Sequence, residues 1–151
     1  STAIVTYLDA KYTDNPLIPA DAESRARVVW FDEFADTILT AASGAMFFNR
    51  IVSPKFVGKP GDDALASKGE TDMGPICVYL EGLLQDGGFL VGESLTLADI
   101  SVASPFVNAA HAGYIPDAAA YPKLTAYLAT MHSRPSFADW IRRERKMLGL
   151  G

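Results

Sequence analysis

The chain has 151 residues, of which 49% are hydrophobic and 21% charged, a composition typical of a folded domain rather than a disordered chain. Its formal net charge of −5 disfavours nucleic acid and anionic membrane surfaces as partners, because both attract clustered lysine and arginine. The single cysteine, Cys77, cannot form an internal disulfide, so we expect a reducing, cytoplasmic environment. No apolar run is long enough to span a membrane.

The first twenty residues predict a short helix followed by an extended connector. Residues 1–10 place Ile4, Val5 and Leu8 on one helical face. Residues 11–20 contain Asn15-Pro16 and Pro19, which end the helix and favour extended backbone. Because the chain starts inside a helical pattern without an initiator methionine, we expect that upstream residues are absent.

The longest helical pattern covers residues 21–51 and is apolar around much of its circumference. Such a helix must be covered on two sides, which places it at the centre of a bundle or between a bundle and a second surface. The pair Ser43-Gly44 predicts a kink. One apolar stripe comprises Val28, Phe31, Ala35, Ile38, Ala42 and Met46, and a second side comprises Trp30, Phe34, Ala41 and Phe48.

The remainder predicts one long loop and four further helices. Residues 54–69 are polar and rich in glycine and proline, which predicts a loop, and a helix follows over 73–85, ended by Asp86-Gly87-Gly88. Later helices are predicted over 97–111, 122–132 and 137–147, the last opened by Ser136-Phe137-Ala138-Asp139. No strand pattern is present, so we expect an all-α helical bundle.

The best-specified helix start is Leu95-Thr96-Leu97-Ala98-Asp99-Ile100. Thr96 suits the N-cap, and the Asp99 carboxylate can reach back to the Thr96 N–H, which together make a capping box. Leu95 and Ile100 occupy the positions of a hydrophobic staple. The apolar surroundings favour a buried, structural Asp99 over a catalytic carboxylate.

The sequence contains no set of residues that indicates catalysis or metal binding. Cys77 lies on an apolar helical stretch, which favours an inert core thiol over a redox role. His111 and His132 have no second ligand at metal-binding spacing, so we predict no metal site. Nothing supports a serine–histidine–aspartate triad, and the phosphate-loop and dinucleotide fingerprints are absent. We therefore assign no catalytic residue.

Four segments in order resemble the cytosolic glutathione S-transferases, in particular those of bacterial type. The segment Gly92-Glu93-Ser94-Leu95-Thr96-Leu97-Ala98-Asp99-Ile100 is similar to the capping-box motif of that family. Residues 121–124 and 134–137 resemble the two short signatures that follow it, and residues 1–8 resemble the last helix of the family's thioredoxin-like domain. The resemblance covers essentially the whole chain.

The resemblance implies that this chain is one part of a two-domain enzyme. Residues 1–10 would be the last helix of an otherwise absent thioredoxin-like domain, residues 11–20 the interdomain linker and residues 21–151 the helical C-terminal domain. The first domain of such enzymes binds glutathione and carries the activating Tyr, Ser or Cys. The chain alone would therefore lack the catalytic residue and supply the pocket for a hydrophobic electrophile.

The resemblance also indicates residues that could contact the substrates. Ser1 matches the serine that binds the γ-glutamyl carboxylate of glutathione, and the alternative is a simple helix cap. Met46, Phe47, Arg50 and, less directly, Tyr114 would line the hydrophobic electrophile pocket, and the alternative is an ordinary core. Arg50 would either meet an anionic ligand or remain solvated.

Three functions agree with the resemblance. The first is conjugation of the glutathione thiolate to hydrophobic electrophiles, with glutathione as co-substrate, in a homodimer. The second is a non-catalytic binding or assembly module of the same fold, because fold alone does not fix function. The third is a glutathione-dependent isomerase or dehalogenase.

Overall fold

The computed structural model describes residues 2–84 and 88–150, and all regular structure within these ranges is helical. The all-α prediction is therefore confirmed for the described residues. No helix in them is long and apolar enough to cross a membrane. The elements are α1 (Thr2–Lys11), α2 (Ala22–Phe34), η1 (Ala35–Leu39), α3 (Thr40–Phe47), η2 (Phe48–Val57), α4 (Asp63–Leu83), α5 (Leu97–His111), α6 (Pro122–Ser133) and α7 (Pro135–Leu148).

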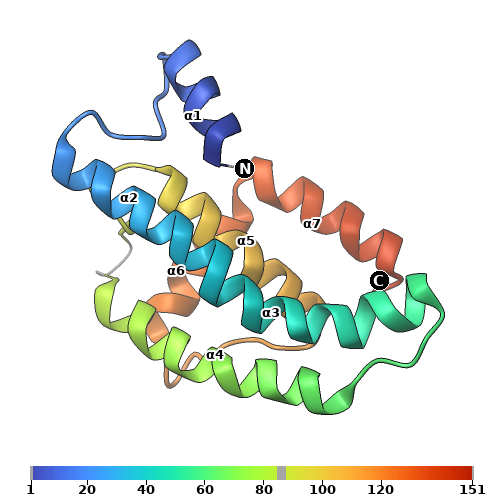
Figure 1. Cartoon of the computed structure of the whole chain (residues 1–151). Helices are drawn as coiled ribbons and strands as arrows, with labels where there is room; N and C mark the ends of the chain where they lie inside the picture. The colour runs from blue at the N-terminus through green and yellow to red at the C-terminus, as the bar shows by residue number, and fades with distance from the viewer. Residues whose placement is uncertain (1, 85–87, 151) are drawn as a thin grey trace.

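The predicted long helix is present and extends beyond its expected end. The elements α2, η1, α3 and η2 follow one another without a break over residues 22–57, as Figure 1 shows. Ser43-Gly44 lies inside the regular α3, where the Ser43 hydroxyl donates to the Leu39 carbonyl at 2.9 Å. The departures from α geometry are instead the π-helical segments η1 and η2, so the irregularity was predicted at the wrong place.

The loop predicted over residues 54–69 is wrong at both ends. Pro54 belongs to η2, and α4 begins at Asp63, so only residues 58–62 connect the two helices. The Asp62 side chain caps α4 by accepting from Leu65 N–H at 3.0 Å. Gly69 lies inside α4. A Cβ at this position would come within 2.5 Å of the Ala42 carbonyl oxygen, which explains why the residue is a glycine. The glycine therefore permits close helix packing between α3 and α4 and does not mark a loop.

Two other helix boundaries differ from their sequence signals. The predicted stop at Asp86-Gly87-Gly88 falls largely outside the described residues, and α4 ends at Leu83. The last helix begins at Pro135, so Ser136 is inside the helix and does not cap it. Proline at the first helical position, with its fixed φ, explains this start better than the Ser136 pattern does.

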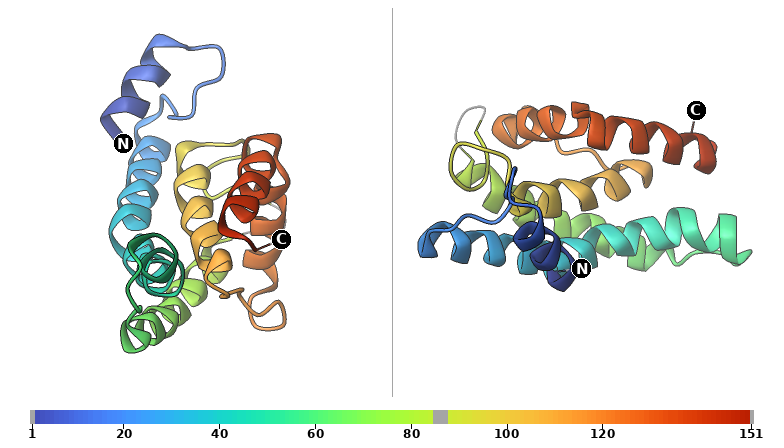
Figure 2. Two further views of the ribbon diagram at one scale, coloured as in Figure 1. Left: turned by 90° about the vertical axis from the view of Figure 1, so that its right-hand side faces the viewer. Right: turned by 90° about the horizontal axis from the view of Figure 1, so that it is seen from above.

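Helix α5 is the centre of the bundle. It contacts the long helix on one side and α6 on another, and α7 lies outside this pair as an outer layer (Figure 2). Leu148 is the one fully buried residue that α7 contributes within the described chain. The core contains Val28, Leu39, Met46, Met73, Cys77, Leu80, Val102, Leu124 and Met131, among other buried apolar residues.

Helix α1 stands apart from the bundle, as the left view in Figure 2 shows. None of its described residues is buried. The linker holds it in place, because Leu17 N–H donates to Asp9 Oδ1 at 2.5 Å and Leu97 N–H donates to the Leu17 carbonyl at 2.9 Å. The linker residues Leu17 and Ile18 are partly buried and pack against the core.

Candidate functional site

The capping box lies at the N-terminus of α5 and is completely enclosed. Asp99 has no exposed surface, and Oδ2 accepts from the Thr96 N–H at 2.9 Å and the Thr96 hydroxyl at 3.1 Å. Oδ1 accepts from Leu90 N–H at 2.9 Å and from the Tyr127 hydroxyl at 3.2 Å. Burial, together with the adjacent Asp99 charge, raises the pKa of Tyr127. These contacts satisfy the carboxylate within the protein and leave it no route to a ligand.

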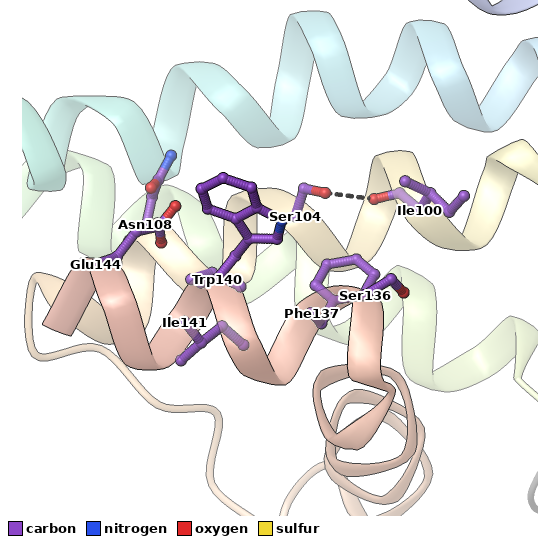
Figure 3. Close-up of a pocket in the computed structure, with 9 residues that line it drawn as sticks. Ile100, Ser104, Asn108, Ser136, Phe137, Trp140, Ile141 and Glu144 are labelled. Atoms are coloured by element: carbon purple, nitrogen blue, oxygen red, sulfur yellow. Dashed lines mark hydrogen bonds between the residues drawn. The ribbon is translucent and has the colours of Figure 1, made fainter.

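A groove runs between α5 and α7. One stripe of α7, spaced as i, i+3, i+4 and i+7, faces α5: Phe137, Trp140, Ile141 and Glu144. Figure 3 shows Phe137 and Trp140 projecting from α7 toward α5, where Ile100, Ser104 and Asn108 meet them. The groove has a volume of about 380 Å³, within the range typical of small-molecule sites.

A second hollow of about 330 Å³ continues this groove toward α1. Ile100, Ser104 and Asn108 line both spaces, so the two are joined along the exposed face of α5. The second space is bounded by Val5 of α1 and by Asp36 and Thr40 of the long helix, among others. We call the joined space the α5 groove, and it ends beside the start of α1.

The start of α1 is fixed to the α5 groove through Asp32. The Thr2 hydroxyl donates to Asp32 Oδ2 at 2.7 Å, and the Ser101 hydroxyl donates to Asp32 Oδ1 at 2.7 Å. Asp32 is 4% exposed, so its two oxygens join α1, α2 and α5 away from solvent. This arrangement holds residue 2, next to the predicted glutathione contact Ser1, at one end of the groove.

Glu144 at the other end of the groove is held by a buried histidine. His111 Nε2 lies 3.1 Å from Glu144 Oε2, and the His111 side chain is only 2% exposed. The Phe47 ring packs near the imidazole, with 6.3 Å between the ring centroids. Phe47 thus supports the residue that positions Glu144. His111 Nδ1 is buried without a hydrogen-bond partner.

The lining of the α5 groove is apolar and acidic. Its floor includes Ile100, Phe137 and Trp140, and its carboxylates are Asp32, Asp36 and Glu144. No lysine or arginine is among the described residues that line it. The groove therefore suits a neutral or cationic molecule with an aromatic or aliphatic body better than an anion.

The described residues that were predicted to bind substrate do not line one common space. Ser1 lies outside the described residues. Met46 has no exposed surface and belongs to the core, whereas Phe47 is partly exposed. Arg50 donates to Glu70 Oε2 at 2.5 Å and to the Ala112 carbonyl at 3.1 Å, so the guanidinium ties η2 to α4 and to the end of α5.

Tyr114 lies in a separate cavity between α5 and α6. This cavity has a volume of about 260 Å³ and is bordered by Phe106, Leu128 and His132 among others. The Tyr114 hydroxyl lies 3.4 Å from Cys77 Sγ. Burial raises the pKa of the Cys77 thiol, although the contact with Tyr114 opposes that effect. A buried thiol in this state is a poor nucleophile.

The sequence interpretation missed the residues that line the α5 groove. Ser104 and Asn108 are four residues apart on α5, and this spacing puts both polar side chains on one face of a mainly apolar helix. Trp140 is exposed on a helix with few buried residues. The exposed tryptophan and the polar face of the central helix are the two sequence signals that could have indicated this groove.

Comparison with known proteins gives consistent matches. The family model "Glutathione S-transferase, C-terminal domain" matches residues 51–144. Elongation factor 1-gamma of Schizosaccharomyces pombe is 33% identical over 98 residues, which cover 65% of this chain and 23% of that protein. Glutathione S-transferase theta-1 of Mus musculus is 29% identical over 130 residues, which cover 84% of this chain and 53% of that protein.

Among solved structures, one of a glutathione S-transferase-I bound with lactoylglutathione aligns with a TM-score of 0.80 and 25% identity. The alignment covers 92% of this chain and 66% of that structure. The present chain thus spans at most about half the length of these two curated relatives.

Proposed function

The chain belongs to the glutathione S-transferase family through its helical C-terminal domain, and we propose that the intact protein conjugates the thiolate of glutathione to hydrophobic electrophiles. In this proposal the α5 groove holds the electrophile. The observation that carries the proposal is that Val5 of α1 lines the groove together with Asp32, which accepts a hydrogen bond from Thr2. Glutathione bound close to the start of α1 would then lie next to the electrophile in the groove.

The chemistry is divided between this chain and the region before it. A residue upstream of this chain would stabilise the thiolate. The thiolate would form a carbon–sulfur bond to the electrophile and either displace its leaving group or open its strained ring. The residues of this chain would bind and orient the electrophile against Phe137 and Trp140 and exclude water from it. Their contribution is proximity and orientation, so no residue of this chain acts as an acid or a base here.

The exposed apolar side of α1 supports a further domain on this side of the molecule. Ile4 is 65% exposed and Tyr7 is 60% exposed, and Leu8 and Tyr12 are exposed as well. Ile4, Tyr7 and Leu8 lie on this short helix and Tyr12 directly follows it, and apolar side chains gathered in this way are usually covered by another surface. We propose that residues 1–10 end a thioredoxin-like domain, residues 11–20 form the linker and residues 21–151 form the helical domain.

We also propose that the intact protein is a homodimer that pairs partly through α2 and α4. Trp30 of α2 is 57% exposed, and its indole N–H donates to the Tyr79 hydroxyl of α4 at 2.9 Å. Val29, Val78 and Leu83 are exposed on the same two helices. Light scattering of the intact protein tests this proposal, and a monomer at high concentration would contradict it.

Turnover of the full-length protein tests the enzymatic proposal. With glutathione and a chlorinated nitroarene, conjugation should release chloride and form the thioether. Calorimetry should show that the protein binds glutathione. The absence of both turnover and glutathione binding would overturn the proposal and favour a non-catalytic module of the same fold. Isomerised or dechlorinated substrate, with no stable thioether, would instead favour the isomerase or dehalogenase alternative.

A further inference from the structure

One end of the α5 groove carries two polar side chains with unused hydrogen-bonding capacity. Glu144 Oε2 lies 3.1 Å from His111 Nε2, whereas Glu144 Oε1 has no hydrogen-bond partner among the described residues. The side-chain amide of Asn108 is also unpaired within the described part of the chain, and both side chains line the groove. Figure 3 shows Asn108 and Glu144 at the same end of the groove, away from Ile100.

The His111 imidazole orients the Glu144 carboxylate without cancelling its charge. The imidazole is only 2% exposed, and its Nδ1 is buried without a hydrogen-bond partner. A doubly protonated ring would bury a second N–H without an acceptor, which is unfavourable. The surroundings therefore favour a neutral ring that donates from Nε2 to Glu144, and the carboxylate keeps its negative charge toward the groove.

The basic residues around Glu144 are held elsewhere. Arg143 does not line the groove, and its guanidinium lies 5.1 Å from the Trp140 ring centroid. Lys55 of η2 donates to the Leu148 carbonyl. Among the described residues, no lysine or arginine lies within ion-pair distance of Glu144. This end of the groove therefore offers a carboxylate to a positively charged group.

The two ends of the α5 groove differ in what they can hold. Val5 and Asp32 lie at the α1 end, where the proposed function places glutathione. Glu144 lies at the α7 end, and Phe137 and Trp140 project toward α5 from the same helix (Figure 3). An elongated molecule on these aromatic rings would therefore have one end near the thiolate and the other near the carboxylate. A few polar groups in an apolar groove are what fixes the orientation of a small molecule.

We propose that the electrophile is a cation, with its reactive carbon at the α1 end of the groove and an ammonium group at Glu144. This inference rests on the proposed conjugation and names its substrate class. The ammonium group would donate to Glu144 Oε1 and to the amide oxygen of Asn108. The sulfur would bond to the carbon, the leaving group would depart with its electron pair, and the ammonium group would stay unchanged. Glu144 is thus a specificity-determining residue.

Two chlorodinitroarenes of matched shape test the proposal with the full-length protein. One is a chlorodinitrobenzylammonium whose ammonium arm is para to the chlorine, and the corresponding benzyl alcohol is the neutral control. Each kcat/KM is divided by the uncatalysed rate constant with glutathione, which removes the difference in intrinsic reactivity. The corrected value should be at least about fivefold higher for the ammonium compound, because a charged hydrogen bond is screened only in part at a side chain that is 41% exposed. This preference should shrink as sodium chloride is raised.

Two variants of equal charge change locate the recognition. Glu144→Gln removes the charge and keeps an oxygen that can accept from His111, so the fold should be retained. The ratio of the two corrected kcat/KM values should fall to about one, mainly because the KM for the ammonium compound rises. Glu93→Gln is the matched control, at an exposed glutamate before α5 that does not line the groove, and it should keep the preference.

The outcomes separate this inference from the proposed function. Turnover of both compounds with equal corrected kcat/KM in the unmodified protein would overturn the inference and leave the proposed conjugation in place. A preference that persists in Glu144→Gln, or that is lost equally in Glu93→Gln, would overturn the assignment to Glu144. Turnover of neither compound would overturn the proposed conjugation and, with it, the inference that rests on it.

Discussion

The Thr2 hydroxyl donates to Asp32 Oδ2 at 2.7 Å, and this hydrogen bond joins the helix before the linker to the long helix of the bundle. The other oxygen of Asp32 accepts from Ser101 of α5. A single buried carboxylate thus connects three helices at the end of the α5 groove where we expect glutathione.

Replacing Asp32 should loosen this junction. Asp32→Ala leaves two partly buried hydroxyls without their acceptor, so we expect the free energy of unfolding in urea to fall by about 1–3 kcal/mol. Asp32→Asn should cost less, because its amide still has an oxygen acceptor and the Ser101 hydroxyl can reverse its role. Equal stability of Asp32→Ala and the unmodified protein would contradict this account.

The buried capping box should be a stability element rather than a catalytic one. Asp99→Ala removes the acceptor for four hydrogen bonds from Leu90, Thr96 and Tyr127, so the unfolding midpoint in denaturant should fall strongly, by about 3 kcal/mol or more. Asp139→Ala is the control, because Asp139 is exposed and forms an exposed ion pair with Arg142. Its effect should be within about 0.5 kcal/mol. Similar effects of the two substitutions would show that the buried box is not stabilising.

The buried His132 should make the fold sensitive to acid. Its pKa is lowered from 6.5, mainly by burial, so the unfolded state takes up a proton at a higher pH than the folded state does. The contribution of His132 to stability is therefore complete above about pH 6.5 and is lost as the pH falls toward the lowered folded value. His132→Gln should flatten the decline of stability below pH 6.5 in denaturant titrations. An unchanged slope would refute the assignment.

Cys77 should not react in the folded protein. The thiol is fully buried and its pKa is raised, so a disulfide reagent should label it only at the rate of unfolding. The measurement is absorbance of the released aromatic thiol, with and without denaturant. Rapid labelling at one equivalent without denaturant would contradict the core position of Cys77.

Elements with a strong local signal were predictable from the sequence. The helix over 97–111 was predicted with its observed bounds because Thr96 and Asp99 fix its start and its apolar pattern is continuous. Residue 122 was predicted correctly as a helix start because proline suits the first position.

Other features depend on contacts between helices and could not be read locally. Gly69 was interpreted as part of a loop, although it permits α4 to approach the Ala42 carbonyl. Arg50 was expected to be solvated or to bind an anion, and it instead pairs with Glu70 across two helices. The α5 groove was missed because Ser104 and Trp140 come from separate helices, and only their packing brings them together.

Filling the α5 groove at its shared residue tests the central claim most directly. Ser104 is exposed and lines both parts of the groove, so Ser104→Trp would occupy the proposed electrophile site. Ser67→Trp, at an exposed serine of α4, is the matched control. In steady-state assays of the full-length protein, Ser104→Trp should raise the KM for the electrophile by about tenfold or more, with the KM for glutathione nearly unchanged. Wild-type KM values in Ser104→Trp, or the same change in Ser67→Trp, would contradict the claim that the electrophile binds in the α5 groove.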